Sequence, residues 1–168
     1  MAAGGRRPRA AYHRPMLRVP VPGGDDLALE HLLLDMNGTL TDRGGLIDGV
    51  AERIAAVRDA LAVRLLTADT FGTAGEVAAG LGVEFERVER GADKRRVLDA
   101  LGPACCVAIG NGANDAPMLR AAALGIALLG PEGASAAALG AADVVCRSVL
   151  EALDLLGDPA ALTATLRP

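Results

Sequence analysis

From residue 31 onward, short apolar runs alternate with segments in which apolar residues recur at helical spacing. The run HLLLD, residues 31–35, has three consecutive leucines, as expected of a strand that is covered on both faces of a parallel sheet. In residues 50–61, charged residues lie between regularly spaced apolar ones, which predicts an amphipathic helix. Its apolar positions are Val50, Ile54, Val57 and Leu61.

The same alternation continues through the rest of the chain and indicates the fold class. It predicts an α/β fold with a doubly wound, Rossmann-like parallel sheet in three α/β/α layers. Ligands of such folds bind at the carboxyl ends of the strands. Further strands are expected at residues 63–69, 83–89, 105–112, 125–129 and 143–146. Further helices are expected at residues 73–82, 92–102, 114–125, 131–141 and 148–157, with one more short helix in the last ten residues.

The N-terminal part has a different pattern. Apolar and polar residues alternate in LRVPV, residues 17–21, and in LALEH, residues 27–31, on either side of a Gly-Gly-Asp-Asp turn, which predicts a β-hairpin that leads into the first long strand. Residues 1–15 are rich in Arg, Pro and Gly and lack the apolar stretch of a secretory signal, so we expect a disordered basic tail. Residues 16–168 would then form a single domain.

Composition and charge exclude several classes of function. The net charge is −4, but residues 1–24 contain five Arg and no acidic residue, so the remainder is strongly acidic. An acidic body argues against nucleic acid as a partner. No apolar run approaches the roughly 18 residues that a membrane span needs. The three cysteines form neither a disulfide framework nor a CxxC motif, which fits a reducing cytoplasm.

Two candidate phosphate-binding positions follow the first buried strands. Asp35 comes at the end of its apolar run and is followed shortly by Asn-Gly-Thr. A carboxylate there can attack phosphorus, and Gly38 allows the backbone to approach the phosphate. Thr67 ends the following strand, so its hydroxyl can donate to a phosphoryl oxygen. Taken singly, an ordinary Asx turn and a helix N-cap explain these features equally well.

Two further features lie later in the chain. Lys94 is the one lysine among 17 basic residues. It stands at the start of a predicted helix, where the helix dipole disfavours a cation, so a functional role is favoured over chance. The turn GNGAND offers Asn111, Asn114 and Asp115 as oxygen ligands for a hard cation. Glycines that merely turn the chain would give the same pattern.

In this order and at these strand ends, the four features resemble the haloacid dehalogenase (HAD) superfamily of phosphotransferases. Its motifs are Asp-x-Asp-Gly-Thr, a strand-end Thr or Ser, a Lys, and Gly-Asp-Gly-x-Asn-Asp. The segment GNGANDAPMLRAAALGIALLGPEGASAAALGAADVV is most similar to the phosphorylation domain of P-type ATPases, and the likeness covers roughly residues 31–150. Only 27 residues separate Thr39 from Thr67, so the nucleotide-binding insert is absent, as in the small soluble P-type-ATPase-like phosphatases.

The resemblance implies a HAD-like domain without a cap and a phosphohydrolase or phosphotransferase that acts through an aspartyl phosphate. Asp35 would be the nucleophile, and Thr67 and Lys94 would hold the phosphoryl group. The other implied phosphate-binding residues are Gly38, Ala68 and Asn114.

The resemblance also implies Mg²⁺ as the cofactor. The ion would bind Asp35, the backbone carbonyl of Asn37, and Asn111, with Asp115 assisting from beside or behind. The partner would be a small phosphorylated substrate. A cap supplied by a second copy of the chain, in a homo-oligomer, is left open.

Asn37 and Asn111 depart from the motifs of the family's phosphatases, where acids stand. An amide can neither protonate a leaving group nor deprotonate water, so Asn37 predicts slow hydrolysis of alkyl phosphates and a preference for activated phosphates. Asn111 removes one negative charge from the metal site, which should weaken Mg²⁺ binding.

Two other readings remain beside the enzyme. The two asparagines support a catalytically impaired phosphate-binding or regulatory module with the same fold. A phospho-acceptor receiver domain shares the parallel sheet, the Asp, the Thr and the Lys, but its acceptor would follow the third strand, whereas Asp35 ends the first long one.

Overall fold

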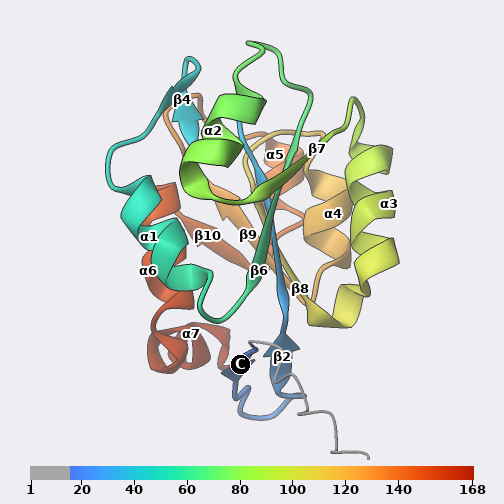
Figure 1. Ribbon diagram of the computed structural model, residues 1–168. Helices are drawn as coiled ribbons and strands as arrows, with labels where there is room; N and C mark the ends of the chain where they lie inside the picture. Colours follow the sequence, from blue (N-terminus) through green and yellow to red (C-terminus); the bar gives the residue numbers. More distant parts are fainter. Residues whose placement is uncertain (1–15) are drawn as a thin grey trace, which may run out of the picture.

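A six-stranded parallel β-sheet forms the centre of the protein (Figure 1). The computed structural model describes residues 16–168, and the tail predicted at residues 1–15 lies outside this part. The strands lie in the order β10-β9-β8-β3-β6-β7. Their bounds are β3 (His31–Asp35), β6 (Ala62–Thr67), β7 (Glu84–Arg87), β8 (Cys106–Gly110), β9 (Leu124–Leu128) and β10 (Val144–Cys146).

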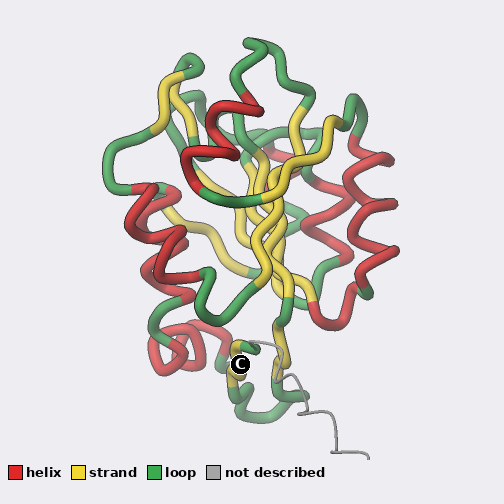
Figure 2. Tube along the Cα trace, in the orientation of Figure 1, coloured by secondary structure: helices red, strands yellow, loops and turns green. Residues whose placement is uncertain are grey.

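Helices cover both faces of this sheet, as the trace in Figure 2 shows. On one face α1 (Val50–Val57) packs against α6 (Val149–Leu156), and on the other α3 (Gly91–Leu101) packs against α4 (Ala116–Ala121). The arrangement confirms the predicted doubly wound α/β fold. The remaining helices are α2 (Ala74–Leu81), α5 (Ala136–Leu139), α7 (Pro159–Leu166) and the 3₁₀ turn η1 (Pro103–Cys105).

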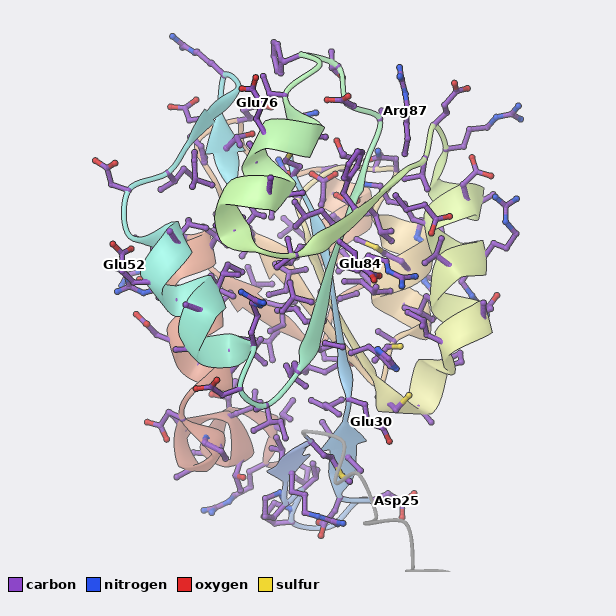
Figure 3. The ribbon with its side chains drawn as sticks, viewed as in Figure 1. Asp25, Glu30, Glu52, Glu76, Glu84 and Arg87 are labelled. Atoms are coloured by element: carbon purple, nitrogen blue, oxygen red, sulfur yellow. The ribbon has the colours of Figure 1, made fainter. Side chains whose placement is uncertain are left out.

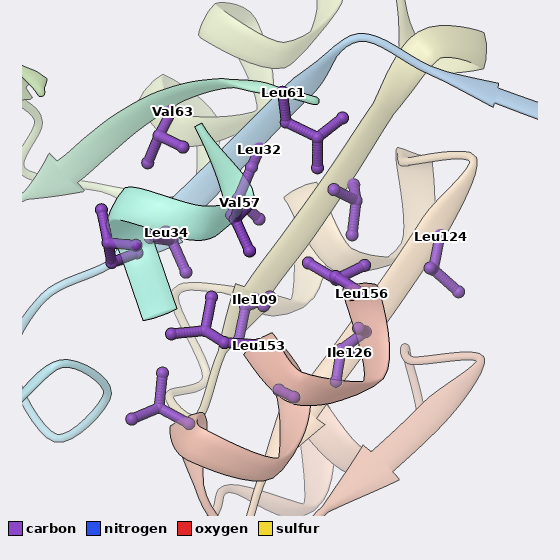
Figure 4. Packing of buried hydrophobic residues seen from close by; sticks show 14 of the residues in the cluster. Leu32, Leu34, Val57, Leu61, Val63, Ile109, Leu124, Ile126, Leu153 and Leu156 are labelled. Atoms are coloured by element: carbon purple, nitrogen blue, oxygen red, sulfur yellow. The ribbon is translucent and has the colours of Figure 1, made fainter. Parts of the chain in front are cut away.

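The sheet separates two hydrophobic cores. Leu32 and Leu34 point into the larger core, beneath α1 and α6 (Figure 4), whereas Leu33 points into the smaller core, beneath α3 and α4. Successive strand residues point to opposite faces, so a strand between two cores must be apolar at every position. This requirement explains the uninterrupted leucine run.

The carboxyl end of β3 lies where the winding of the sheet reverses. From β3 the chain continues through β6 to β7 on one side, and it then crosses back to β8 on the other side of β3. Asp35 pairs with Leu66, and Leu34 pairs with Ile109. Thr67 and Gly110 therefore end the neighbouring strands beside Asp35, at the position where open α/β sheets bind their ligands.

Two small hairpins flank the sheet. The predicted N-terminal hairpin is confirmed, with β1 (Leu17–Val19) antiparallel to β2 (Leu27–Leu29). The second pairs β4 (Thr41–Asp42) with β5 (Gly45–Leu46), and its turn is Arg43-Gly44. Both turn residues have positive φ, which is the geometry that two-residue hairpins favour.

Two helices are shorter than predicted. The helix expected at residues 131–141 contains only Ala136–Leu139, because Gly133 has a φ of +80° and the side chain of Ser135 caps the helix. The helix expected at residues 114–125 ends at Ala121, because β9 already begins at Leu124. Within residues 16–168, no helix is long and apolar enough to cross a membrane.

Candidate active site

The side chains of Asp35 and Lys94 meet at the carboxyl end of β3. Asp35 is two residues beyond Leu33, so its side chain lies on the face that α3 and α4 cover. Lys94 is in the first turn of α3 and is only 1% exposed. Its Nζ atom lies 2.6 Å from Asp35 Oδ1 and 2.6 Å from Asp115 Oδ1. Three charged residues from separate β-α units therefore converge on one buried point.

Asp115 is held from behind by the backbone of the Gly-rich turn. Its Oδ2 accepts hydrogen bonds from the amides of Asn111 and Gly112, at 3.0 and 2.9 Å. A Cβ on Gly110 would lie 2.4 Å from Asp115 Cγ, so only glycine leaves room for the carboxylate. Both oxygens of Asp115 are thus engaged, one of them with Lys94. In this arrangement Asp115 positions the lysine.

The charges of the site do not balance. Burial raises the pKa of Asp35 to about 6, the negative charge of Asp115 adds to the rise, and Lys94 partly offsets it. Burial alone would lower the pKa of Lys94, but the attraction of the two carboxylates outweighs it, so this pKa lies above its usual value. With all three groups ionised, the site has one negative charge in excess, which favours binding of a cation.

A cluster of oxygen donors lies on the other side of Asp35. The hydroxyl of Thr39 lies 3.3 Å from Asp35 Oδ2 and 3.4 Å from Asn111 Oδ1, so it joins the two side chains. The Oδ1 atom of Asn37 is buried and has no hydrogen-bond partner within the described residues. Gly38 has a φ of +73°, and a Cβ there would collide with neighbouring side chains. The first motif is therefore a tight turn with surplus oxygen acceptors.

These residues fit a hard divalent cation. Such ions prefer carboxylate, amide and backbone carbonyl oxygens, which Asp35, Asn111 and the carbonyl of Asn37 supply. The part of the chain that the structure describes contains no group of three His, Cys, Asp or Glu residues arranged to hold a metal. The asparagine at position 111 explains why: the donor set is mostly neutral.

The other expected phosphate-binding residues lie around the same edge of the sheet. Thr67 is buried, and its hydroxyl accepts a hydrogen bond from the amide of Asp69 at 3.0 Å, so its own proton remains available to an acceptor. Ala68, which follows it, is half-buried. Asn114 is exposed in the turn before α4. No side-chain hydrogen bond joins Thr67 or Asn114 to the Asp35–Lys94 pair among the described contacts.

Sequence reasoning missed two neighbours of the site. Thr39 was visible as the last residue of the Asp-x-Asn-Gly-Thr motif, and its contact with Asn111 shows what it does. The loop after β9 left no comparable signal. In that loop the carbonyl of Gly133 accepts a hydrogen bond from Asn111 Nδ2 at 2.9 Å.

Comparison with known proteins finds structures that share this fold. No protein-family model matches the chain. The uncharacterized protein MJ0073 of Methanocaldococcus jannaschii is 44% identical over 61 residues, which are 36% of this chain and 66% of that protein. A zinc-transporting PIB-type ATPase in its E2·Pi state matches 71% of this chain with 30% identity and a TM-score of 0.61. The chain has the fold of the haloacid dehalogenase superfamily, like the putative HAD family hydrolase from Streptomyces avermitilis, which has a TM-score of 0.63 and 21% identity over 82% of this chain and 93% of that one. The chain spans only 20% of that ATPase.

Two phosphatases share the fold at lower identity. The cobalt-bound deoxy-D-mannose-octulosonate 8-phosphate phosphatase of Haemophilus influenzae has a TM-score of 0.65 and 16% identity, over 83% of this chain and 94% of that one. The Moraxella catarrhalis 3-deoxy-D-manno-octulosonate 8-phosphate phosphatase, solved with magnesium and phosphate ions and 3-deoxy-D-manno-octulosonate, has a TM-score of 0.61 and 16% identity, over 81% and 90%. At these identities the likeness shows the fold alone.

Proposed function

We propose that the chain is a divalent-cation-dependent phosphohydrolase or phosphotransferase in which Asp35 becomes phosphorylated. The observation that carries the proposal is the contact of 2.6 Å between Lys94 Nζ and Asp35, buried at the switch point of the sheet. An acid and an ammonium at this place supply a nucleophile and a positive charge for the phosphoryl oxygens. Superfamily members solved with magnesium and phosphate, or with cobalt, support it.

The proposed reaction has two displacements at phosphorus. A carboxylate oxygen of Asp35 forms a bond to phosphorus, and the bond to the leaving oxygen breaks, with its electron pair going to the leaving group. Water then attacks the aspartyl phosphate, releases inorganic phosphate and regenerates the carboxylate. Lys94 stabilises the charge on the transferred group in both steps. Asp115 keeps Lys94 in place.

The cation site would be formed by Asp35, the backbone carbonyl of Asn37, and Asn111. A bound Mg²⁺ supplies positive charge to the phosphoryl oxygens and helps to align the substrate. Thr39 already joins Asp35 to Asn111 and so fixes the spacing of two of the donors. The residues proposed to hold the phosphate are Gly38, Thr67, Ala68, Lys94 and Asn114.

The substrate class follows from the side chain at position 37. General acid–base catalysis is typically worth about 10²–10⁴-fold in rate, and an amide cannot provide it. Displacement of a leaving group that needs no proton, such as a carboxylate or a nucleoside diphosphate, is slowed little by the absence of an acid. We therefore expect small acyl phosphates or phosphoanhydrides to be better substrates than sugar phosphates.

A direct assay tests this function. Release of inorganic phosphate is measured with acetyl phosphate, ATP, an aryl phosphate and a sugar phosphate, with Mg²⁺ and with a chelator. We expect Mg²⁺-dependent turnover of the activated phosphates that disappears in Asp35→Ala. Turnover that persists in Asp35→Ala, or a sugar phosphate as the best substrate, would refute the proposal.

A second candidate is a binding or regulatory module with an impaired site, which Asn37 and Asn111 favour. It predicts no turnover by the parent protein and activity only after Asn37→Asp. The same assay on that variant separates the two functions.

A further inference from the structure

The loop between β9 and α5 contacts two parts of the candidate site, the Gly-rich turn at Asn111 and the first motif at Gly38. Besides the bond from Asn111 Nδ2 to the Gly133 carbonyl, the amide of Ser135 donates to the Asn111 carbonyl at 2.8 Å. A Cβ on Gly130 would lie 2.6 Å from the carbonyl oxygen of Gly38, so the loop backbone lies against the first motif. Whatever side chain this loop presents therefore has a defined position relative to the cation site.

That side chain is Glu132. Its Oε2 atom lies 2.9 Å from the place that a Cβ on Gly38 would occupy, and Asn111 Nδ2 lies at the same distance from that place. The carboxylate and the Asn111 amide thus flank one face of Gly38. Glu132 is exposed, and within residues 16–168 its side chain forms no hydrogen bond or ion pair. A carboxylate without a partner among these residues therefore lies near Asn111, the position where the superfamily's last motif has an acid and this chain has an amide.

We propose that Glu132 is the third oxygen-donor side chain of the cation site and supplies the negative charge that Asn111 lacks. This inference rests on the proposed function. Hard cations bind more tightly as the number of carboxylates around them rises, and Asp35 and Asn111 together provide only one. Glu132 would supply the second carboxylate, from a loop instead of from the end of a strand. The bonds from Asn111 to Gly133 and from Ser135 to Asn111 anchor the loop, and so hold the backbone on the C-terminal side of Glu132 next to Asn111.

Direct binding measurements on the metal-free, full-length chain test this assignment. Mg²⁺, and Mn²⁺ as a second probe, are titrated calorimetrically into the parent protein, Glu132→Gln and Glu52→Gln. Glu52 is an exposed glutamate on α1 and is a matched control for the loss of one negative charge (Figure 3). We expect Kd to rise about tenfold or more in Glu132→Gln and to stay within about twofold of the parent in Glu52→Gln.

A third variant separates failure of this inference from failure of the proposed function. Asp35→Asn should abolish binding if the cation site is where we place it. Weakened binding in Asp35→Asn together with unchanged binding in Glu132→Gln would overturn the role of Glu132 and leave the site intact. Binding that neither variant affects, or no binding by the parent, would overturn both.

The substitution Asn111→Asp provides an independent check. If Glu132 supplies the missing charge, Asn111→Asp should improve Mg²⁺ binding more in the E132Q background than in the parent. In that background the new carboxylate at position 111 replaces the one lost at position 132. Equal improvement in the two backgrounds would mean that the two positions act on separate sites, and the inference would fail.

Discussion

The Nζ atom of Lys94 lies 2.6 Å from Asp35 and equally close to Asp115, so one ammonium neutralises only one of two buried carboxylates. This imbalance connects the stability of the fold to its proposed chemistry. An excess negative charge is costly while the site is empty of cation, and it is useful once a cation and a phosphoryl group are bound.

Removal of the lysine charge should destabilise the protein strongly. Lys94→Met keeps much of the side-chain volume but leaves two carboxylates in a buried site without a counter-charge. Breaking a buried pair in this way typically costs about 3–5 kcal/mol in the free energy of unfolding. Urea unfolding at pH 8 should show this loss, and the loss should shrink at pH 5, where one carboxyl can be protonated. A loss that is small and equal at both pH values would contradict the charge argument.

Asp35→Asn should stabilise the metal-free protein at neutral pH. The pKa of Asp35 is raised to about 6 in the folded state, from an ordinary value of 3.8. A carboxyl whose pKa is higher in the folded state than in the unfolded state stabilises the fold at a pH below its unfolded-state pKa. This stabilisation is lost as the pH rises through the folded-state pKa, so the parent protein loses stability between about pH 4 and 6. Asp35→Asn cannot lose stability in this way, so at pH 7 its free energy of unfolding should exceed that of the parent by on the order of 1 kcal/mol or more.

Thermal unfolding of the parent and the variant, measured between pH 4 and 8 in a chelator, checks the prediction. Because other carboxyls titrate in both proteins, the informative quantity is the difference between the two curves. This difference should grow between pH 4 and 6. A constant difference would show that Asp35 is not strained by burial.

Asn37→Asp should broaden the substrate range. The new carboxyl can protonate a leaving oxygen, so we expect hydrolysis of alkyl phosphates to rise by about 10²-fold or more. Acetyl phosphate, whose leaving group needs no proton, should change far less. Asn37→Ser, which also replaces the amide but adds no acid, is the control. Parallel gains on both substrates would indicate that the new carboxylate acts on a step that both share, such as the attack of water on the aspartyl phosphate, rather than on the leaving group.

Asn111→Asp should tighten Mg²⁺ binding and weaken the metal-free fold. The amide of Asn111 donates to the Gly133 carbonyl at 2.9 Å, and a carboxylate would meet that carbonyl oxygen without a proton to share. Loss of such a hydrogen bond typically costs about 1 kcal/mol. We expect a lower Tm in a chelator and a larger rise in Tm when Mg²⁺ is added than in the parent protein. If Mg²⁺ raises Tm equally in both, Asn111 is not a ligand.

Gly110→Ala should disrupt the support of Lys94. The added Cβ would lie 2.4 Å from Asp115 Cγ, so the carboxylate must move away from the lysine or the backbone must shift. We expect a destabilisation of about 1–3 kcal/mol and loss of turnover. Gly75→Ala, in α2, is the matched control because nothing lies within 4 Å of its added Cβ. It should be neutral or stabilising by about 0.5–1 kcal/mol.

The sequence predicted the fold from simple periodicities, and it predicted the meeting of Asp35 with Lys94 from the resemblance of its motifs to the HAD superfamily. Apolar runs and helical spacing indicate a doubly wound sheet, and such a sheet brings strand ends together. The role of Asp115 depended on more: only the turn geometry shows that both of its oxygens are taken by Lys94 and by backbone amides. Residue type and spacing do not reveal which oxygen faces which neighbour, so the sequence alone could not predict these contacts.

Glu132 could not be found from the sequence for a different reason. It lies in an irregular loop that was expected to be helical, and its position beside Gly38 depends on how that loop folds back from β9. Contacts of this kind join segments almost a hundred residues apart and have no period. The short length of α5 follows from the same loop, since Gly133 and the cap at Ser135 delay the start of the helix.

Phosphorylation of Asp35 itself is the most direct test of the account. The protein is mixed with acetyl phosphate and Mg²⁺, quenched in acid after increasing times, and analysed by mass spectrometry of its peptides, beside Asp35→Asn. We predict one phosphoryl group on the peptide that contains Asp35, removable by hydroxylamine and absent from the variant. Absence of any phosphoryl group while phosphate is released, or equal labelling of the variant, would contradict the central claim.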